Sequence, residues 1–159
     1  MIQEHLKALK GLAPLPVRLM IGYGFFAHGI AKVARGPEHF VSIIQALGIP
    51  FGEPMAWFTI GLELICGAMM IAGFLVPLIA LPMLAILAVA IVTVHAQFGF
   101  SSIKLLDVTS SGPRFGPPGM ETDLLYIAGI AALVLGGPGP FAVDNWLRRQ
   151  FLRARRSRS

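Results

Sequence analysis

The sequence predicts an all-α membrane protein, a bundle of four helices that each cross a bilayer. Of the 159 residues, 55% are hydrophobic and only 13% are charged, whereas about a quarter of the residues of a soluble domain are charged. The charged residues gather near the chain ends and in two connecting segments, and long apolar runs separate them. Apolar runs of about 20 residues suit helices that cross hydrocarbon. We expect one bundle over residues 1–147, followed by a basic tail over residues 148–159.

The four spans are expected at residues 16–33, 55–75, 77–98 and 123–143. Prolines at positions 14 and 16 favour a helix start there, because the first turn of a helix does not need the missing N–H. Pro82 lies near the first turns of the third span, where it can kink the helix. The fourth span has the shortest apolar core, which ends at Leu135 before a Gly/Pro cluster.

The distribution of Lys and Arg predicts the orientation of the bundle. An even number of spans puts both chain ends on one side, and both ends are basic. The side richer in Lys and Arg is normally cytoplasmic, so we expect cytoplasmic termini and a first span that is not cleaved as a signal peptide. The first and third connectors then face outward. Residues 101–119 of the third connector are rich in Gly, Pro and Ser, which fits a turn-rich connector or a lid over the bundle.

Two function classes are disfavoured by composition. The net charge of +5 does not predict nucleic-acid binding, because the basic residues flank membrane spans and no aromatic residues interleave them for base stacking. Cys66 is the only cysteine, so a disulfide relay within the chain is excluded. The basic tail is explained most simply as a topology signal, and docking on lipid or on a partner protein is the alternative.

Three ionisable side chains, His28, Glu63 and His95, lie inside predicted spans and in the same half of the membrane. Such groups are costly in hydrocarbon and normally mark a site. Lys32 follows His28 by one helical turn and is near enough to the outer interface to carry its ammonium group to water. Lys32, His28 and His95 are the available partners of Glu63. Tyr126 enters the bundle on the fourth span and is either an interfacial anchor or a further binding residue.

Several chemistries fit these residue types. A histidine donating to a quinone oxygen, with Glu63 exchanging a proton, would form a quinone headgroup site. Two histidines and a carboxylate also form a recognised metal ligand set, and His28 with His95 would suit one b-type haem. The alternative is a purely structural role, in which these polar side chains fix the register of the helices and take part in no reaction.

The motifs together resemble the DoxX family of small four-helix bacterial inner-membrane proteins. The resemblance extends over residues 14–147 and is carried by five segments in order: residues 24–32, 47–50, 61–67, 95–100 and 136–144. It marks His28, Lys32, Glu63, His95 and Asp144 as positions of interest. Relatives in that family include membrane subunits of thiosulfate:quinone oxidoreductase and proteins linked to oxidative-stress defence.

The resemblance and the polar residues together favour a membrane subunit of a quinone-linked redox or oxidative-stress system. In this hypothesis His28 and Glu63 are catalytic, and Lys32, His95 and Tyr126 help to bind the substrate. A protein partner is expected, because the chain has no evident electron-transfer centre. The alternatives are a non-catalytic scaffold or assembly factor, and a small proton-coupled transporter or metal-handling protein that uses Glu63. The sequence leaves the oligomeric state open, a homo-oligomer included.

Overall fold

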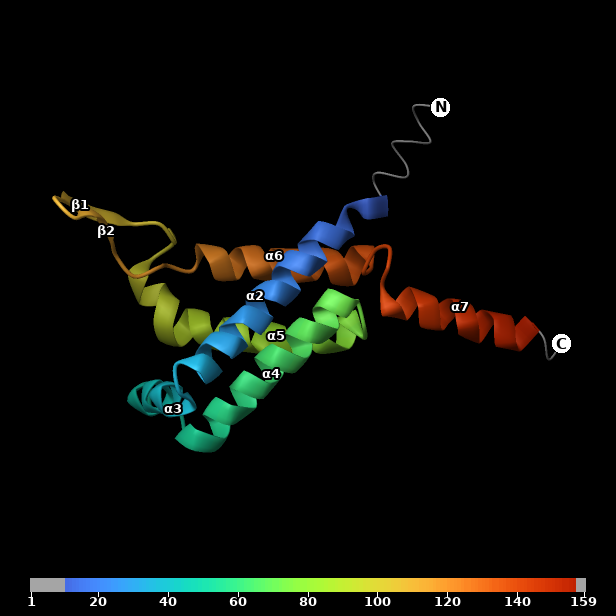
Figure 1. Ribbon diagram of the computed structural model, residues 1–159, viewed down its shortest axis with the longest axis horizontal. Helices are drawn as coiled ribbons and strands as arrows, with labels where there is room; N and C mark the ends of the chain where they lie inside the picture. Colours follow the sequence, from blue (N-terminus) through green and yellow to red (C-terminus); the bar gives the residue numbers. More distant parts are fainter. Residues whose placement is uncertain (1–10, 157–159) are drawn as a thin grey trace, which may run out of the picture.

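The fold is a bundle of four long helices. The computed structural model describes residues 11–156 and the side chains of residues 11–150. The bundle consists of α2 (Pro14–Ala34), α4 (Gly52–Ala72), α5 (Val76–Ala90) and α6 (Glu121–Gly136). Each helix packs against two others, in the cyclic order α2, α4, α5, α6 and back to α2 (Figure 1). Short π and 3₁₀ segments, η1 (Ile91–His95) and η2 (Ala96–Phe98), extend α5.

Two helices in the described part of the chain are long and apolar enough to cross a membrane. They are Gly52–Ala72, and Val76–Phe98 when η1 and η2 are counted with α5. α2 is as long as α4, at 21 residues, but carries three basic side chains, those of Arg18, His28 and Lys32, where α4 has none. α6 has 16 residues. The mostly helical fold is therefore as expected, and the crossing of the membrane by four helices stays a prediction.

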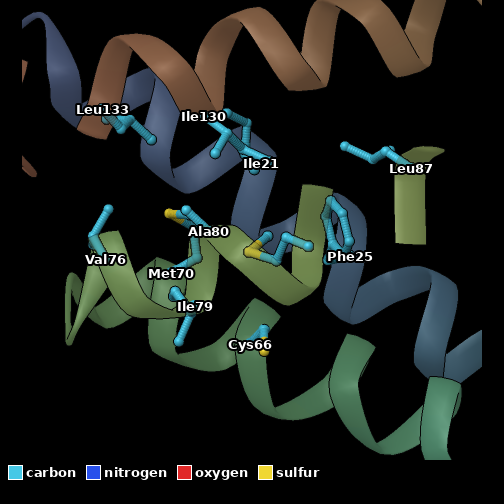
Figure 2. Packing of buried hydrophobic residues seen from close by; sticks show 11 residues of the cluster. Ile21, Phe25, Cys66, Met70, Val76, Ile79, Ala80, Leu87, Ile130 and Leu133 are labelled. Carbon is cyan, nitrogen blue, oxygen red and sulfur yellow. The ribbon is translucent and has the colours of Figure 1, made fainter. Parts of the chain in front are cut away.

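The core is apolar and receives side chains from all four helices (Figure 2). Met70 of α4 and Met83 of α5 are fully buried at its centre, and Ile130 of α6 is fully buried beside them. Methionine is flexible enough to fill the irregular space between helices. The other buried members of this cluster are Ile21, Phe25, Cys66, Val76, Ile79, Ala80, Leu87 and Leu133.

α2 and α4 approach so closely that backbone meets backbone. A Cβ atom added at Gly67 would lie 2.6 Å from the backbone nitrogen of Phe26, and one added at Gly22 would lie 2.7 Å from that of Ile71. Small residues allow such a crossing in membrane bundles. The face of α4 that carries Gly67 therefore packs directly against α2.

The turn between α4 and α5 is tied to the far end of the chain. α4 ends at Ala72, three residues before the predicted end, because Gly73 and Leu75 take left-handed backbone angles (φ 68° and 52°). The carboxylate of Asp144 accepts hydrogen bonds from the backbone N–H groups of Leu75 and Val76, at 2.9 and 3.4 Å. Asp144 therefore satisfies donors that the first turn of α5 leaves free.

The fourth helix is shorter than expected. α6 ends at Gly136, and the predicted continuation to residue 143 is wrong because Pro138 and Pro140 fall in the next turn and cannot donate helical hydrogen bonds. The irregular segment is held by Arg18, whose Nη1 donates to the Pro138 carbonyl at 2.8 Å. α7 (Val143–Arg156) then begins inside the region predicted as membrane span.

The first and third connectors contain structure that was not predicted. The first holds α3 (Pro37–Ala46), which packs against α4 and α2. The third holds an antiparallel hairpin of β1 (Leu105–Thr109) and β2 (Gly112–Phe115), which corrects the expectation of a purely α-helical chain. Figure 1 shows the hairpin projecting beyond the ends of α5 and α6.

Candidate functional site

The principal polar feature of the bundle is an ion pair between α2 and α4. Lys32 Nζ donates to both carboxylate oxygens of Glu63, at 2.6 Å each. Glu63 is 5% exposed, and the side chain of Lys32 is 21% exposed. Two charges taken out of water need close pairing of this kind, because each loses several kcal/mol of hydration.

The helix sequences explain why these two side chains meet. Ile60, Glu63, Gly67 and Met70 follow helical spacing, and all four are buried, so Glu63 lies on the face of α4 that packs inside the bundle. Gly29 on α2 leaves room beside this face, since a Cβ atom there would lie 3.3 Å from Glu63 Cβ.

The pair is close to the connector between α2 and α4. Lys32 lies two residues before the end of α2, and its ammonium group stands 4.7 Å from the centre of the Phe40 ring on α3. A cation over an aromatic face is stabilised by the ring quadrupole. Lys32 therefore turns toward the bundle and α3. Of the two roles that the sequence left open for its ammonium group, the structure shows the pairing with Glu63 and not an ammonium group directed to water.

A second buried pair joins the end of the third helix to the start of the fourth. His95 Nδ1 and Asp123 Oδ2 are 2.5 Å apart, and Asp123 is buried. Asp123 lies in the first turn of α6, where the helix dipole favours a negative charge. This pair and the Lys32–Glu63 pair lie toward the same end of the bundle.

The π segment explains how His95 reaches Asp123. Met83 and Leu87 face the core, and a continuous α-helix would bring residues 91 and 94 onto their face, with His95 nearer the exposed side of Ala88 and Val92. A π turn takes up one additional residue. It therefore rotates the following residues by about 100° relative to α5 and directs His95 toward α6.

The three residues singled out from the sequence do not form one cluster. Within the described side chains, Glu63 bonds to Lys32 and His95 bonds to Asp123, and neither contact includes His28. His28 lies on an exposed part of α2. Nor do the described residues bring together three or more His, Cys, Asp or Glu side chains that could hold a metal ion.

Tyr126 packs inside the bundle. Its ring meets that of Phe25 edge to face, with centroids 5.8 Å apart, and its hydroxyl occupies the space where a side chain on Gly24 would stand. Asp123, one turn before Tyr126, is the site residue that the sequence did not single out. In the sequence, Asp123 is an acidic residue at the start of a helix, which is common and does not by itself indicate a site. Its partner His95 reaches it only because of the π turn.

These features define a helical membrane bundle with two part-buried acid–base pairs. The chain belongs to the DoxX family. The sequence model of that family matches residues 13–96, which are more than half of the chain. The matched segment includes Lys32, Glu63 and His95 and ends before the hairpin. The chain is also 26% identical to the "uncharacterized membrane protein Rv3486" of Mycobacterium tuberculosis, over 84% of this chain and 80% of that protein. No solved structure matches.

Proposed function

We propose that this DoxX-family protein is a membrane subunit of a quinone-linked redox or oxidative-stress system, and that Lys32 and Glu63 bind the quinone headgroup. The observation that carries the proposal is the Lys32–Glu63 pair, in which a carboxylate near the middle of a membrane-length helix is held by a single lysine. Ionisable groups at such a depth are rare and usually functional.

Three features of this pair and its surroundings suit a quinone headgroup. The Lys32 ammonium group has three N–H donors and makes two contacts to Glu63, so it has one donor for a quinone oxygen. Glu63 is within hydrogen-bond reach of that ammonium group and can pass protons toward the site. The Phe40 ring beside Lys32 offers an aromatic surface for the flat headgroup. Reduction of a quinone to a quinol takes two electrons, supplied here by the redox centre of a partner protein, and two protons.

The proposal includes four membrane spans with cytoplasmic termini in a bacterial inner membrane. It is supported by the length of α2 and by the basic residues near both chain ends. The 16 residues of α6 rise about 24 Å, against a hydrocarbon thickness of about 30 Å, a mismatch that local bilayer thinning accommodates.

Quinone binding can be measured directly in the purified protein. In a Trp146→Phe background, Trp57 is the only tryptophan, and it lies on α4 six residues before Glu63. We expect ubiquinone-1 to quench Trp57 fluorescence saturably, and Lys32→Met or Glu63→Gln to weaken binding about tenfold or more, the loss of one charge-assisted hydrogen bond.

Glu53→Gln is the matched control, because Glu53 is an exposed carboxylate on the same helix. It should bind ubiquinone-1 as the wild type does. Equal quenching in all four proteins, or quenching that never saturates, would contradict the quinone site.

A non-catalytic scaffold is the second candidate, and the hairpin favours it. The pairing of Asp107 with Arg114 and of Val108 with Pro113 puts the charges on one face of the hairpin and apolar residues on the other. Val108 and Phe115 are exposed there, which is typical of a protein-binding surface. A photo-crosslinker at Val108 in intact membranes should then capture one discrete protein that the same probe at Asp107 does not capture.

A further inference from the structure

We propose that α7 is an interfacial helix that binds the anionic lipid surface at the end of the bundle where α6 ends. This inference adds a lipid-binding surface to the proposed function and uses none of the quinone-site residues. Figure 1 shows α7 extending away from the bundle, with the hairpin at the opposite end of the molecule.

The first argument is the pattern of side chains on α7. Val143, Trp146 and Leu147 recur at the spacing of one helix face. Trp146 is 59% exposed and Leu147 is exposed beside it, so this apolar stripe is uncovered at these two residues within the described structure. Tryptophan favours the boundary between headgroups and hydrocarbon, because its ring is apolar and its N–H is polar.

The second argument is charge. The helix sequence contains five arginines, at positions 148, 149, 153, 155 and 156, and Asp144 as its one acidic residue. Arg148 and Arg149 are exposed, about 100° or more around the helix from Leu147 and about 60° or more from Trp146. A basic face next to an apolar stripe matches anionic headgroups above hydrocarbon.

The third argument is the position of the helix along the bundle. The first turn of α7 is tied to the turn between the two membrane-length helices: the N–H of Asp144 donates to the Gly73 carbonyl at 3.1 Å, and its carboxylate accepts from Leu75 N–H. Trp146 follows two residues later, about 3 Å along the helix. The tryptophan is thus at the level where α4 ends and α5 begins, which is where a bilayer surface would lie.

A lipid surface fits α7 better than a second copy of the chain does. Two copies of α7 packed through their apolar stripes would bring together two sets of five arginines, and like charges at short range repel. A bilayer containing anionic lipid supplies the opposite charge to Arg148 and Arg149, which follow directly after Leu147. It also covers the exposed stripe without a shaped groove.

The test uses the full-length protein in lipid nanodiscs. A Trp57→Phe background leaves Trp146 as the only tryptophan. We expect Trp146 to emit at shorter wavelength, and to be quenched by acrylamide about threefold less, in phosphatidylglycerol than in phosphatidylcholine. Arg148→Gln with Arg149→Gln should remove most of this difference, and 0.5 M NaCl should reduce it, because salt screens charge.

The matched control is Arg35→Gln with Arg114→Gln, which removes two exposed positive charges at the other end of the molecule. It should leave the lipid dependence of Trp146 unchanged. Equal exposure of Trp146 in both lipids overturns the inference. Shielding in phosphatidylcholine that grows with the number of copies per disc overturns it in favour of self-association. Lys32 and Glu63 stay intact throughout, so neither result bears on the quinone site.

Discussion

Replacement of Lys32 by methionine should destabilise the protein more than replacement of Glu63 by glutamine. Lys32→Met leaves the Glu63 carboxylate without its cation at 5% exposure, near the middle of α4. Glu63→Gln leaves an ammonium group whose side chain is already 21% exposed and lies two residues from the end of α2, so it can swing toward water. The two single variants therefore lose the same contact with different consequences.

The expected loss in the free energy of unfolding depends on how deeply the remaining charge is buried. Removing one partner of a buried ion pair costs about 3–5 kcal/mol, because the remaining charge stays desolvated. We expect Lys32→Met to fall in that range. Glu63→Gln should cost about 1–2 kcal/mol, since the lysine can recover part of its hydration. The double variant Lys32→Met with Glu63→Gln removes both charges and should cost only about 1–2 kcal/mol, because no buried charge is left without its partner.

The assay is equilibrium unfolding of the purified protein in mild detergent at a fixed pH, with circular dichroism as the signal that reports the loss of helix. The free energies of unfolding of the wild type, the two single variants and the double variant form a double-mutant cycle. The two single losses sum to about 4–7 kcal/mol, so with a loss of about 1–2 kcal/mol in the double variant we expect a coupling energy of about 3–5 kcal/mol between residues 32 and 63. If the two single effects simply add in the double variant, the pair is not a desolvated ion pair and the reasoning fails.

Three further substitutions test the packing and the polar contacts. Gly67→Leu should cost about 3 kcal/mol or more, because the new side chain would meet the backbone of α2. Gly61→Leu is the control and should be nearly neutral, since nothing lies within 4 Å of a Cβ atom there. Equal unfolding midpoints for the two variants would refute the close crossing of α2 and α4. Asp144→Ala should lower the unfolding free energy by about 1 kcal/mol, measured by the same denaturation, as the first turn of α5 loses its cap. Asp123→Ala should cost about 2 kcal/mol, because it removes a buried charged hydrogen bond. Asp107→Ala, in an exposed ion pair, is the control for both and should cost about 0.5 kcal/mol or less; losses that match the control would show that neither contact stabilises the fold.

Apolar patterning predicted the positions of the long helices well. The expected spans at residues 16–33, 55–75 and 77–98 differ from the observed helices by only a few residues at most ends. The face of Glu63 was predictable too, because helical spacing places it on one stripe with Gly67. The pairing with Lys32 was one of three open choices, since spacing within a helix does not say which residue of another helix lies opposite.

Features that depend on tertiary context were not predictable. The short helix α3 and the hairpin each need a surface or a turn from the rest of the chain to form, because isolated elements of that length are marginal in water. The partner of His95 was missed because helical spacing assumes 3.6 residues per turn. The π segment breaks that spacing four residues before His95.

The π segment also divides the third helix into two parts that can change independently. The rotation of residues 76–90 about the helix axis is fixed by the core side chains Met83 and Leu87. The rotation of the residues after Ile91 depends instead on the one additional residue that the π segment contains. Deleting a residue between positions 91 and 95 would let the helix relax to regular α geometry, leave the core in place, and turn the base of the hairpin and His95 by about 100°. A one-residue change in length can thus redirect the hairpin end of this bundle while its interior stays the same.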